Sequence, residues 1–188
     1  MDLLDLFERG TAWTATKVAG ATDHLDAQTP CEEWTVRRLL DHLLAGQQLF
    51  AAAPSGAEVA PPSGPPPELV GDDPAAQYEE ARKATAHAYA QPGVLEGMVK
   101  TPGGEMPAMQ ILGIAFCDQL IHGWDLAKAT GQDSAMPPDL AEVSYQLLDG
   151  RITDEARGPG KNFMAAIPVA DDASVQDRLL AYCGRDPK

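Results

Sequence analysis

The sequence predicts an all-α protein, a four-helix bundle with short additional helices and a possible small hairpin. Apolar residues recur at helical spacing in several long segments, and proline- and glycine-rich stretches separate these segments. The strict alternation that is typical of strands is scarce. The chain has 188 residues, of which 44% are hydrophobic, and this suits one core. We therefore expect a single domain over residues 1–188.

The first two helices are predicted over residues 2–20 and from residue 36 onward. A turn over residues 29–34 separates them, and Thr35 is a suitable N-cap for the second helix. Apolar residues at helical spacing indicate the buried face of each helix. These are Leu3, Leu4, Leu6, Phe7, Trp13 and Val18 in the first helix, and Val36, Leu39, Leu40, Leu43, Leu44 and Phe50 in the second.

Prolines and glycines crowd residues 54–73, so this segment is predicted to be a loop. Asp73 followed by Pro74 is a typical helix start, and the third helix should run to about Tyr89. Its apolar face is modest, with Tyr78, Ala81, Thr85 and Ala88.

The second half of the chain carries three further predicted helices. Residues 92–106 form a loop or a hairpin that turns at residues 102–104. The fourth helix starts at Pro107 and ends before Gly131, which is a suitable C-cap residue. A fifth helix is predicted to open at Pro137-Pro138-Asp139 and to run through Leu148, and a last short helix is predicted over residues 174–183.

The charge balance restricts the classes of partner. There are 14 basic and 28 acidic residues, a formal net charge of −14, which argues against binding to nucleic acid or to anionic membranes. The apolar run of residues 111–117 is too short to span a bilayer before Asp118 interrupts it. The three cysteines show no CxxC motif, which favours a reducing compartment. We expect a cytoplasmic protein.

Asp118 and His122 are the most informative residues of the sequence. They lie four residues apart in the most apolar run of the chain, so they share one face of the predicted fourth helix. An unpartnered carboxylate and imidazole in an apolar environment would cost several kcal/mol. His42, at the edge of the apolar face of the second helix, can supply a third ligand from a facing helix. His42, Asp118 and His122 are therefore candidate ligands of a divalent metal, with zinc as the first choice and nickel or iron as alternatives.

Simpler interpretations stand beside this hypothesis. An Asp–His pair at this spacing also forms ordinary helical contacts, and a histidine near a core is often only hydrogen-bonded. Asp125 could orient a ligand histidine from behind, or could pair with Arg37 or Arg38. Cys117 is expected to be a core residue. Cys31 is assigned a packing or turn role, although a helix N-terminus nearby could lower its pKa. Trp34 and Trp124 are expected in the core, with the lining of a pocket as the alternative, and His24 and His87 are expected at the surface.

Two stretches resemble a known family. The segment from Thr29 to Arg37 followed by Leu40-Asp41-His42-Leu43, and the segment from His122 to Gly131 with its His-Gly-Trp-Asp-Leu-Ala pattern, resemble the DinB-like superfamily. More narrowly, they resemble the actinobacterial metal-binding group related to the N-terminal domain of mycothiol-dependent maleylpyruvate isomerase. The resemblance implies a four-helix bundle with a divalent metal between helices. The ligand positions that it implies fall on His42, Asp118 and His122.

The resemblance also implies a function. We expect a metal-dependent enzyme, a thiol S-transferase or isomerase, with mycothiol as a possible cosubstrate and an electrophile as its partner. The isomerase has an additional C-terminal domain that this chain is too short to contain, so isomerisation of maleylpyruvate itself is not carried over. The alternative is a non-catalytic metal-binding module that serves in stress, in regulation or as a dimeric scaffold. A homodimer is possible under either hypothesis.

Overall fold

The structure is a computed structural model that describes residues 2–31, 34–60 and 64–188. The chain divides into two compact units, Met1–Ser134 and Ala135–Lys188. The prediction of one domain over residues 1–188 stays a prediction.

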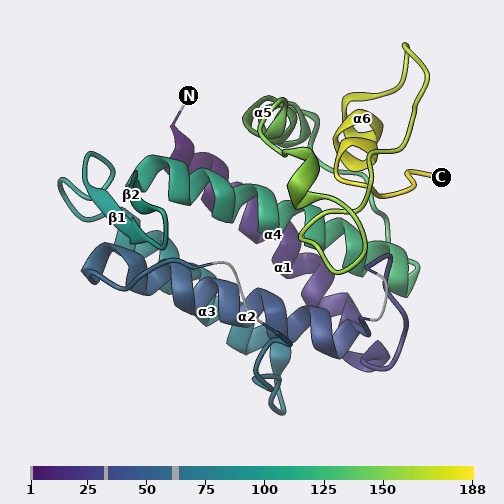
Figure 1. Cartoon of the computed structure of the whole chain (residues 1–188). Helices are drawn as coiled ribbons and strands as arrows, with labels where there is room; N and C mark the ends of the chain where they lie inside the picture. The colour runs from purple at the N-terminus through teal and green to yellow at the C-terminus, as the bar shows by residue number, and fades with distance from the viewer. Residues whose placement is uncertain (1, 32–33, 61–63) are drawn as a thin grey trace. The chain divides into compact units, whose positions relative to one another are not determined.

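The first unit is a four-helix bundle made of α1 (Leu3–Ala21), α2 (Val36–Ala52), α3 (Pro74–Tyr89) and α4 (Ala108–Thr130). Helix α1 packs along α4 and against α3, while α2 packs along α3 and against α4. Helices α1 and α4 form one layer, and α2 and α3 form the other (Figure 1). The predicted all-α fold is therefore confirmed.

The helix boundaries follow the capping residues that the sequence offers. The side chains of Thr35 and Asp73 accept hydrogen bonds from the backbone N–H groups of Arg38 and Ala76, at 3.4 and 2.9 Å. Gly131 ends α4 in the left-handed conformation, with φ of 67°, which a glycine adopts without steric cost. Pro107 differs from the prediction by one position, because it is the last residue of a strand and α4 begins at Ala108.

The core of the bundle lies between the apolar faces of all four helices. The predicted face of α2 is buried in full. A cluster of buried residues joins it to the other helices: Val18, Ala21, Val36, Leu39, Leu40, Leu43, Leu44, Tyr78 and Leu126. Helix α4 is buried on most sides within this chain, which explains its apolar character. Trp124 is a core residue, 1% exposed, as predicted.

A small hairpin connects α3 to α4. Strands β1 (Met98–Thr101) and β2 (Gly104–Pro107) pair antiparallel, with Thr101 opposite Gly104. The turn therefore falls at Pro102 and Gly103, as the sequence predicted, and Gly104 has a φ of 116° that favours glycine. The sequence indicates a loop or a small hairpin over residues 92–106, and the structure forms the hairpin.

The proline-rich segment is anchored to the bundle at several points. The 3-10 helix η2 (Ala53–Ser55) extends α2, and the N–H of Val59 donates to the carbonyl of Lys100 in β1 at 2.8 Å. Further on, the carboxylate of Asp41 accepts from the N–H groups of Leu69 and Val70, at 2.6 and 2.8 Å. Residues 61–63, within the predicted loop, lie outside the described residues.

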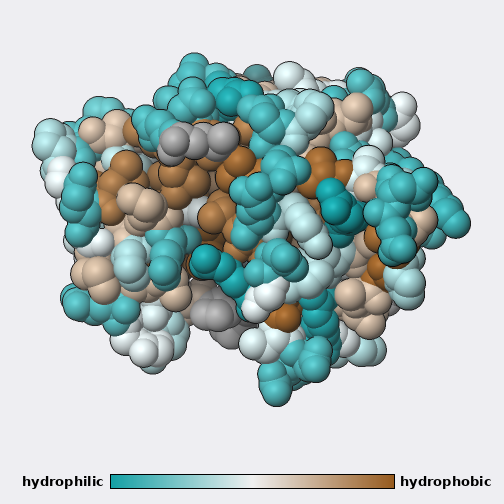
Figure 2. Space-filling view, turned by 90° about the horizontal axis from the view of Figure 1, so that it is seen from above, coloured by the Kyte–Doolittle hydropathy of each residue, from teal (hydrophilic) through white to brown (hydrophobic). Residues whose placement is uncertain are grey.

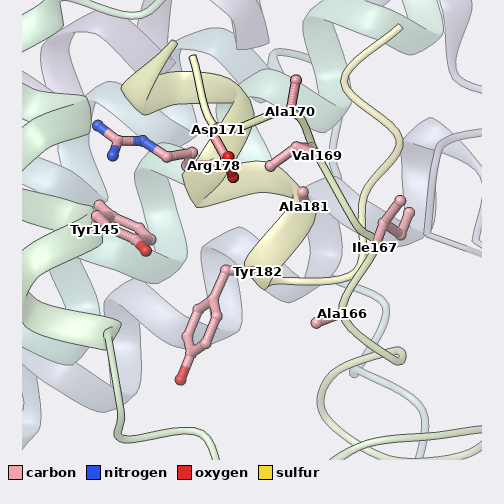
Figure 3. Close-up of a pocket in the computed structure, with 9 residues that line it drawn as sticks. All are labelled: Tyr145, Ala166, Ile167, Val169, Ala170, Asp171, Arg178, Ala181 and Tyr182. Carbon is pink, nitrogen blue, oxygen red and sulfur yellow. The ribbon is translucent and has the colours of Figure 1, made fainter. Parts of the chain in front are cut away.

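The second unit contains α5 (Pro138–Leu148), the 3-10 helix η3 (Asp154–Ala156) and α6 (Val175–Tyr182). Tyr145 of α5 meets Tyr182 of α6 edge to face, with ring centroids 6.2 Å apart. Arg157 stacks on Tyr182 and donates to the carbonyl oxygens of Met164 and Tyr182. A hollow of about 350 Å³ lies beside α6, with Tyr145, Arg178 and Tyr182 among its lining residues (Figure 3).

The face seen in Figure 2 mixes hydrophilic and apolar areas, and the apolar side chains gather mainly in the left half of the view. The large apolar side chains with the highest exposure among the described residues are Met98, Met109, Ile114 and Val169. Within the described parts of the chain, the helices are too short or too polar to cross a membrane.

Candidate metal centre

The three predicted ligands come together between α2 and α4 of the first unit. His42 lies on α2, and Asp118 and His122 lie one turn apart on α4. Asp118 Oδ1 is 3.1 Å from His42 Nε2 and 3.6 Å from His122 Nε2. The imidazole rings of the two histidines meet edge to face, with centroids 4.8 Å apart. One carboxylate oxygen therefore faces one nitrogen of each ring.

These separations fit a small divalent cation. Ligand atoms at about 2.0–2.1 Å from a tetrahedral ion are about 3.3–3.4 Å from one another. The two measured distances to Asp118 Oδ1, 3.1 and 3.6 Å, bracket that value. All three ligand atoms lie within 4.8 Å of one another. The set has two imidazole nitrogens and one carboxylate oxygen, which suits zinc, nickel or iron, and three protein ligands leave a position for an exchangeable one.

The side chains are half-buried rather than sealed in the core. Their exposed fractions are 17% for His42, 25% for Asp118 and 12% for His122. The three groups are therefore partly exposed to solvent. The remaining surface of α4 around them is apolar and mostly buried, which lowers the local dielectric and strengthens electrostatic interactions.

Asp125 contacts the ring nitrogen of His122 that does not face Asp118. Asp125 is fully buried, and its Oδ2 lies 2.8 Å from His122 Nδ1. An ionised carboxylate can only accept a hydrogen bond, so the proton of a neutral His122 is held on Nδ1 and the lone pair of Nε2 is directed towards Asp118. Of the two roles considered for Asp125, this contact supports the orienting one.

Cys31 adds a second hydrogen bond to the same carboxylate oxygen. Its Sγ donates to Asp125 Oδ2 at 3.2 Å and lies 3.9 Å from His122 Nδ1. The turn before α2 positions the thiol, since the N–H of Cys31 donates to the hydroxyl oxygen of Thr29. Cys31 is therefore more than a packing residue. Spacing did not reveal this contact, because residues 31 and 125 lie far apart in sequence.

Trp34 forms an aromatic wall beside the two histidines. Its ring centroid lies 5.1 Å from that of His42 and 6.2 Å from that of His122, and its plane is nearly parallel to that of His122. Trp34 is half-buried and lines the site, which is the alternative to a core position that the sequence left open for it. Glu32 and Glu33, which belong to the same sequence motif, lie outside the described residues.

The protonation states favour ligation. Burial by itself would raise the pKa of Asp118, but the charge and hydrogen bond of His42, followed by His122 and Gln119, outweigh it and lower the pKa to about 2. Burial lowers the pKa of His122 although Asp125 opposes it. At neutral pH the site thus presents an ionised carboxylate and a neutral His122, the forms in which these groups bind metals.

Three other residues lie where the sequence predicted them. Cys117 is buried in the core, and His24 and His87 are exposed, as predicted. Sequence reasoning missed Gln119, which is buried and whose side-chain N–H donates to Asp118 Oδ2 at 3.1 Å. A glutamine in the apolar run next to a candidate ligand was the available signal.

Comparison with known proteins agrees with the fold and with the motifs. Residues 7–127 match the family model described as the mycothiol maleylpyruvate isomerase N-terminal domain. Because the match covers most of the chain, the protein belongs to this family of helical-bundle domains. The matched residues include His42, Asp118, His122 and Asp125.

The chain is also similar to proteins of known sequence and to a solved structure. An uncharacterized protein of Mycobacterium tuberculosis, in strains H37Rv and CDC 1551, is 32% identical over 189 residues, which covers 98% of both chains. The crystal structure of the mycothiol-dependent maleylpyruvate isomerase superposes with a TM-score of 0.61. It is 19% identical, and the match covers 83% of this chain and 71% of that one. This likeness concerns the fold.

Proposed function

We propose that this protein binds a divalent metal through His42, Asp118 and His122 and uses it in the transfer or isomerisation chemistry of a low-molecular-weight thiol. The convergence of these three groups, with Asp125 orienting His122, is the observation that carries the proposal. Zinc is the first choice, because two imidazoles and a carboxylate with one exchangeable position are a typical catalytic zinc set.

Mycothiol is the proposed thiol. The family takes its description from a mycothiol-dependent isomerase, and the superposed crystal structure is of that enzyme. A bound divalent ion would supply the Lewis acidity that lowers the pKa of a coordinating thiol to neutral pH or below.

The protein's own residues have distinct roles in this proposal. His42 and His122 supply nitrogen ligands from facing helices, and Asp118 supplies negative charge between them. Asp125 holds the tautomer of His122, and Trp34 shields one side of the two rings from water. The half-exposed side of the site is where a thiol and its electrophilic partner would enter. The proposed cytoplasmic location and homodimer are compatible with this function.

Metal analysis of the purified chain tests the first step. The wild type, purified without chelator and then loaded with zinc, should hold a bound ion that His42→Ala and His122→Ala lose. His87→Ala is the matched control, since His87 is exposed on α3 and should leave the metal content unchanged. A wild-type protein that stays metal-free after loading would contradict the proposal.

A cobalt-substituted protein tests the second step. Cobalt(II) in such a site absorbs visible light in a pattern that depends on its ligands, so mycothiol at millimolar concentration should shift the spectrum if its sulfur enters the coordination sphere. A metal-loaded protein with an unchanged spectrum would instead favour the non-catalytic metal-binding module.

A further inference from the structure

A hydrogen-bonded network of buried polar side chains crosses the core of the bundle and ends at Asp118. It includes Thr14 of α1, Gln47 of α2, Tyr78 and Thr85 of α3, and Gln119 of α4, each 0% exposed. Polar groups at such positions are costly unless they are hydrogen-bonded, and these are well satisfied by one another. All four helices of the bundle contribute to this network.

The hydrogen bonds of this network run in one direction, from donor to acceptor towards Gln119. The hydroxyl of Thr85 donates to Gln47 Oε1 at 2.6 Å, and Gln47 Nε2 donates to Gln119 Oε1 at 3.1 Å. Tyr78 donates to the same Gln119 oxygen at 2.8 Å. Burial raises the pKa of Tyr78 well above its usual range, so its hydroxyl keeps the proton that it donates.

This direction determines the orientation of the Gln119 amide. Its oxygen accepts from two donors, so its NH₂ group must point the other way, towards Asp118 Oδ2 at 3.1 Å. The opposite orientation would place the amide oxygen of Gln119 against the carboxylate of Asp118, which can only accept a hydrogen bond. The backbone is held as well, because the hydroxyl of Thr14 donates to the carbonyl of Gln119 at 2.9 Å.

The two oxygens of Asp118 are consequently in different environments. Oδ2 accepts the N–H of Gln119, while Oδ1 lies 3.1 and 3.6 Å from the two histidine nitrogens. We infer that Gln119 is a positioning residue that makes Asp118 a ligand through Oδ1 alone and thereby keeps one coordination position free for an exchangeable ligand. This inference rests on the proposed metal site and concerns the residue that determines its geometry.

Substitution of Gln119 by methionine separates this role from a purely structural one. Methionine has a similar length and helix propensity but offers no N–H to Asp118. In Gln119→Met the carboxylate is free to bind the metal through both oxygens. We expect the visible absorption of the cobalt(II) protein to weaken as the coordination number rises, and the affinity for zinc to fall about tenfold, as for other groups that orient metal ligands.

Thr85→Val is the matched control. It removes a hydroxyl from the same network, at the end far from Asp118, without changing a group that contacts Gln119 directly. It should lower the melting temperature but leave the cobalt spectrum and the affinity for zinc as in the wild type. If Gln119→Met also lowers the melting temperature and leaves both metal readouts unchanged, the network serves only to pack the helices and the inference is wrong.

Two further outcomes keep the test decisive. If Gln119→Met does not fold, Tyr78→Phe carries the test, because it keeps the core volume and removes one of the two donors that orient the Gln119 amide. It should weaken the cobalt absorption in the same direction by a smaller amount, and an unchanged spectrum would overturn the inference. A wild-type protein that binds neither cobalt nor zinc would refute the proposed function itself, and is distinguishable from failure of the Gln119 role.

Discussion

Replacement of Asp125 by asparagine is the sharpest test of the site. Asp125 is fully buried and contacts both His122 and Cys31, and asparagine has nearly the same shape. The carboxylate can only accept, so it requires the proton of a neutral His122 on Nδ1. The asparagine amide can instead donate to Nδ1, which moves the ring proton to Nε2 and prevents that atom from binding a metal.

The magnitude of the effect can be estimated in two ways. The 2.8 Å hydrogen bond from His122 has a charged acceptor, and such bonds contribute about 1.5–3 kcal/mol. Loss of a group that orients a metal ligand typically lowers metal affinity about 10- to 100-fold, or about 1.4–2.7 kcal/mol. Because the two ranges overlap, we expect zinc to bind Asp125→Asn at least about tenfold more weakly.

The assay is a competition titration of zinc against a chromophoric chelator at neutral pH, with circular dichroism to confirm that each variant is folded. Asp72→Asn makes the same chemical change at an exposed position and should bind zinc as the wild type does. Cys31→Ala removes only a weak, neutral donor to Asp125 and should cost about threefold or less. A folded Asp125→Asn protein with an affinity within twofold of the wild type would refute the reasoning.

Three further predictions concern stability. Gly123→Ala should destabilise the protein by about 1–3 kcal/mol in urea denaturation, because a Cβ there would lie 2.7 Å from the hydroxyl of Thr14. The control is Gly46→Ala, whose Cβ would meet only contacts of 3.4 Å or more, so it should be neutral or stabilising by up to about 1 kcal/mol. The opposite order of stability would contradict the packing. Asp41→Ala should speed hydrogen exchange of the two loop amides at residues 69 and 70 while the helices stay protected, and equal exchange in both proteins would show that the anchor is unimportant. In the metal-free protein the pKa of Asp118 is lowered to about 2, whereas the pKa of an aspartate in the unfolded chain is about 3.9, so the ionised side chain stabilises the fold above pH 3.9. About 2 kcal/mol of the free energy of unfolding should therefore be lost as the pH falls from 4 to 2. Asp118→Asn should show a flatter dependence of stability on acid pH.

Helix positions were predicted closely because they depend on local physical chemistry. Thr35 and Asp73 cap helices, and Gly131 terminates one, through hydrogen bonds and dihedral angles within a few residues. The apolar face of α2 was predicted in full for a similar reason, since periodicity reports burial directly. The face of α3 was predicted less well. Ala86 and Tyr89 are buried there, because a helix between two neighbours is covered on more than one side.

The candidate site was likewise predictable from the sequence only where the relation between its residues is local. The i, i+4 spacing of Asp118 and His122 on one helix is a local property, and their placement in an apolar run already indicated that both needed partners. The roles of Cys31 and Gln119 could not be derived from spacing. Each depends on a side chain that another segment brings within hydrogen-bond distance.

The sequence by itself determined which segments are helical, where they end, and which polar residues would be forced into an apolar environment. These follow from dihedral preferences, capping and periodicity, which act over a few residues. Only the tertiary structure decided that His42 faces Asp118 Oδ1, that Asp125 takes the orienting position behind His122, and that a polar chain from α3 holds the other oxygen of Asp118. A hydrogen bond requires donor and acceptor atoms about 3 Å apart, and the ligand atoms around a tetrahedral ion lie about 3.3–3.4 Å apart. Only the packing of helices and turns against one another sets such distances between residues that are remote in sequence.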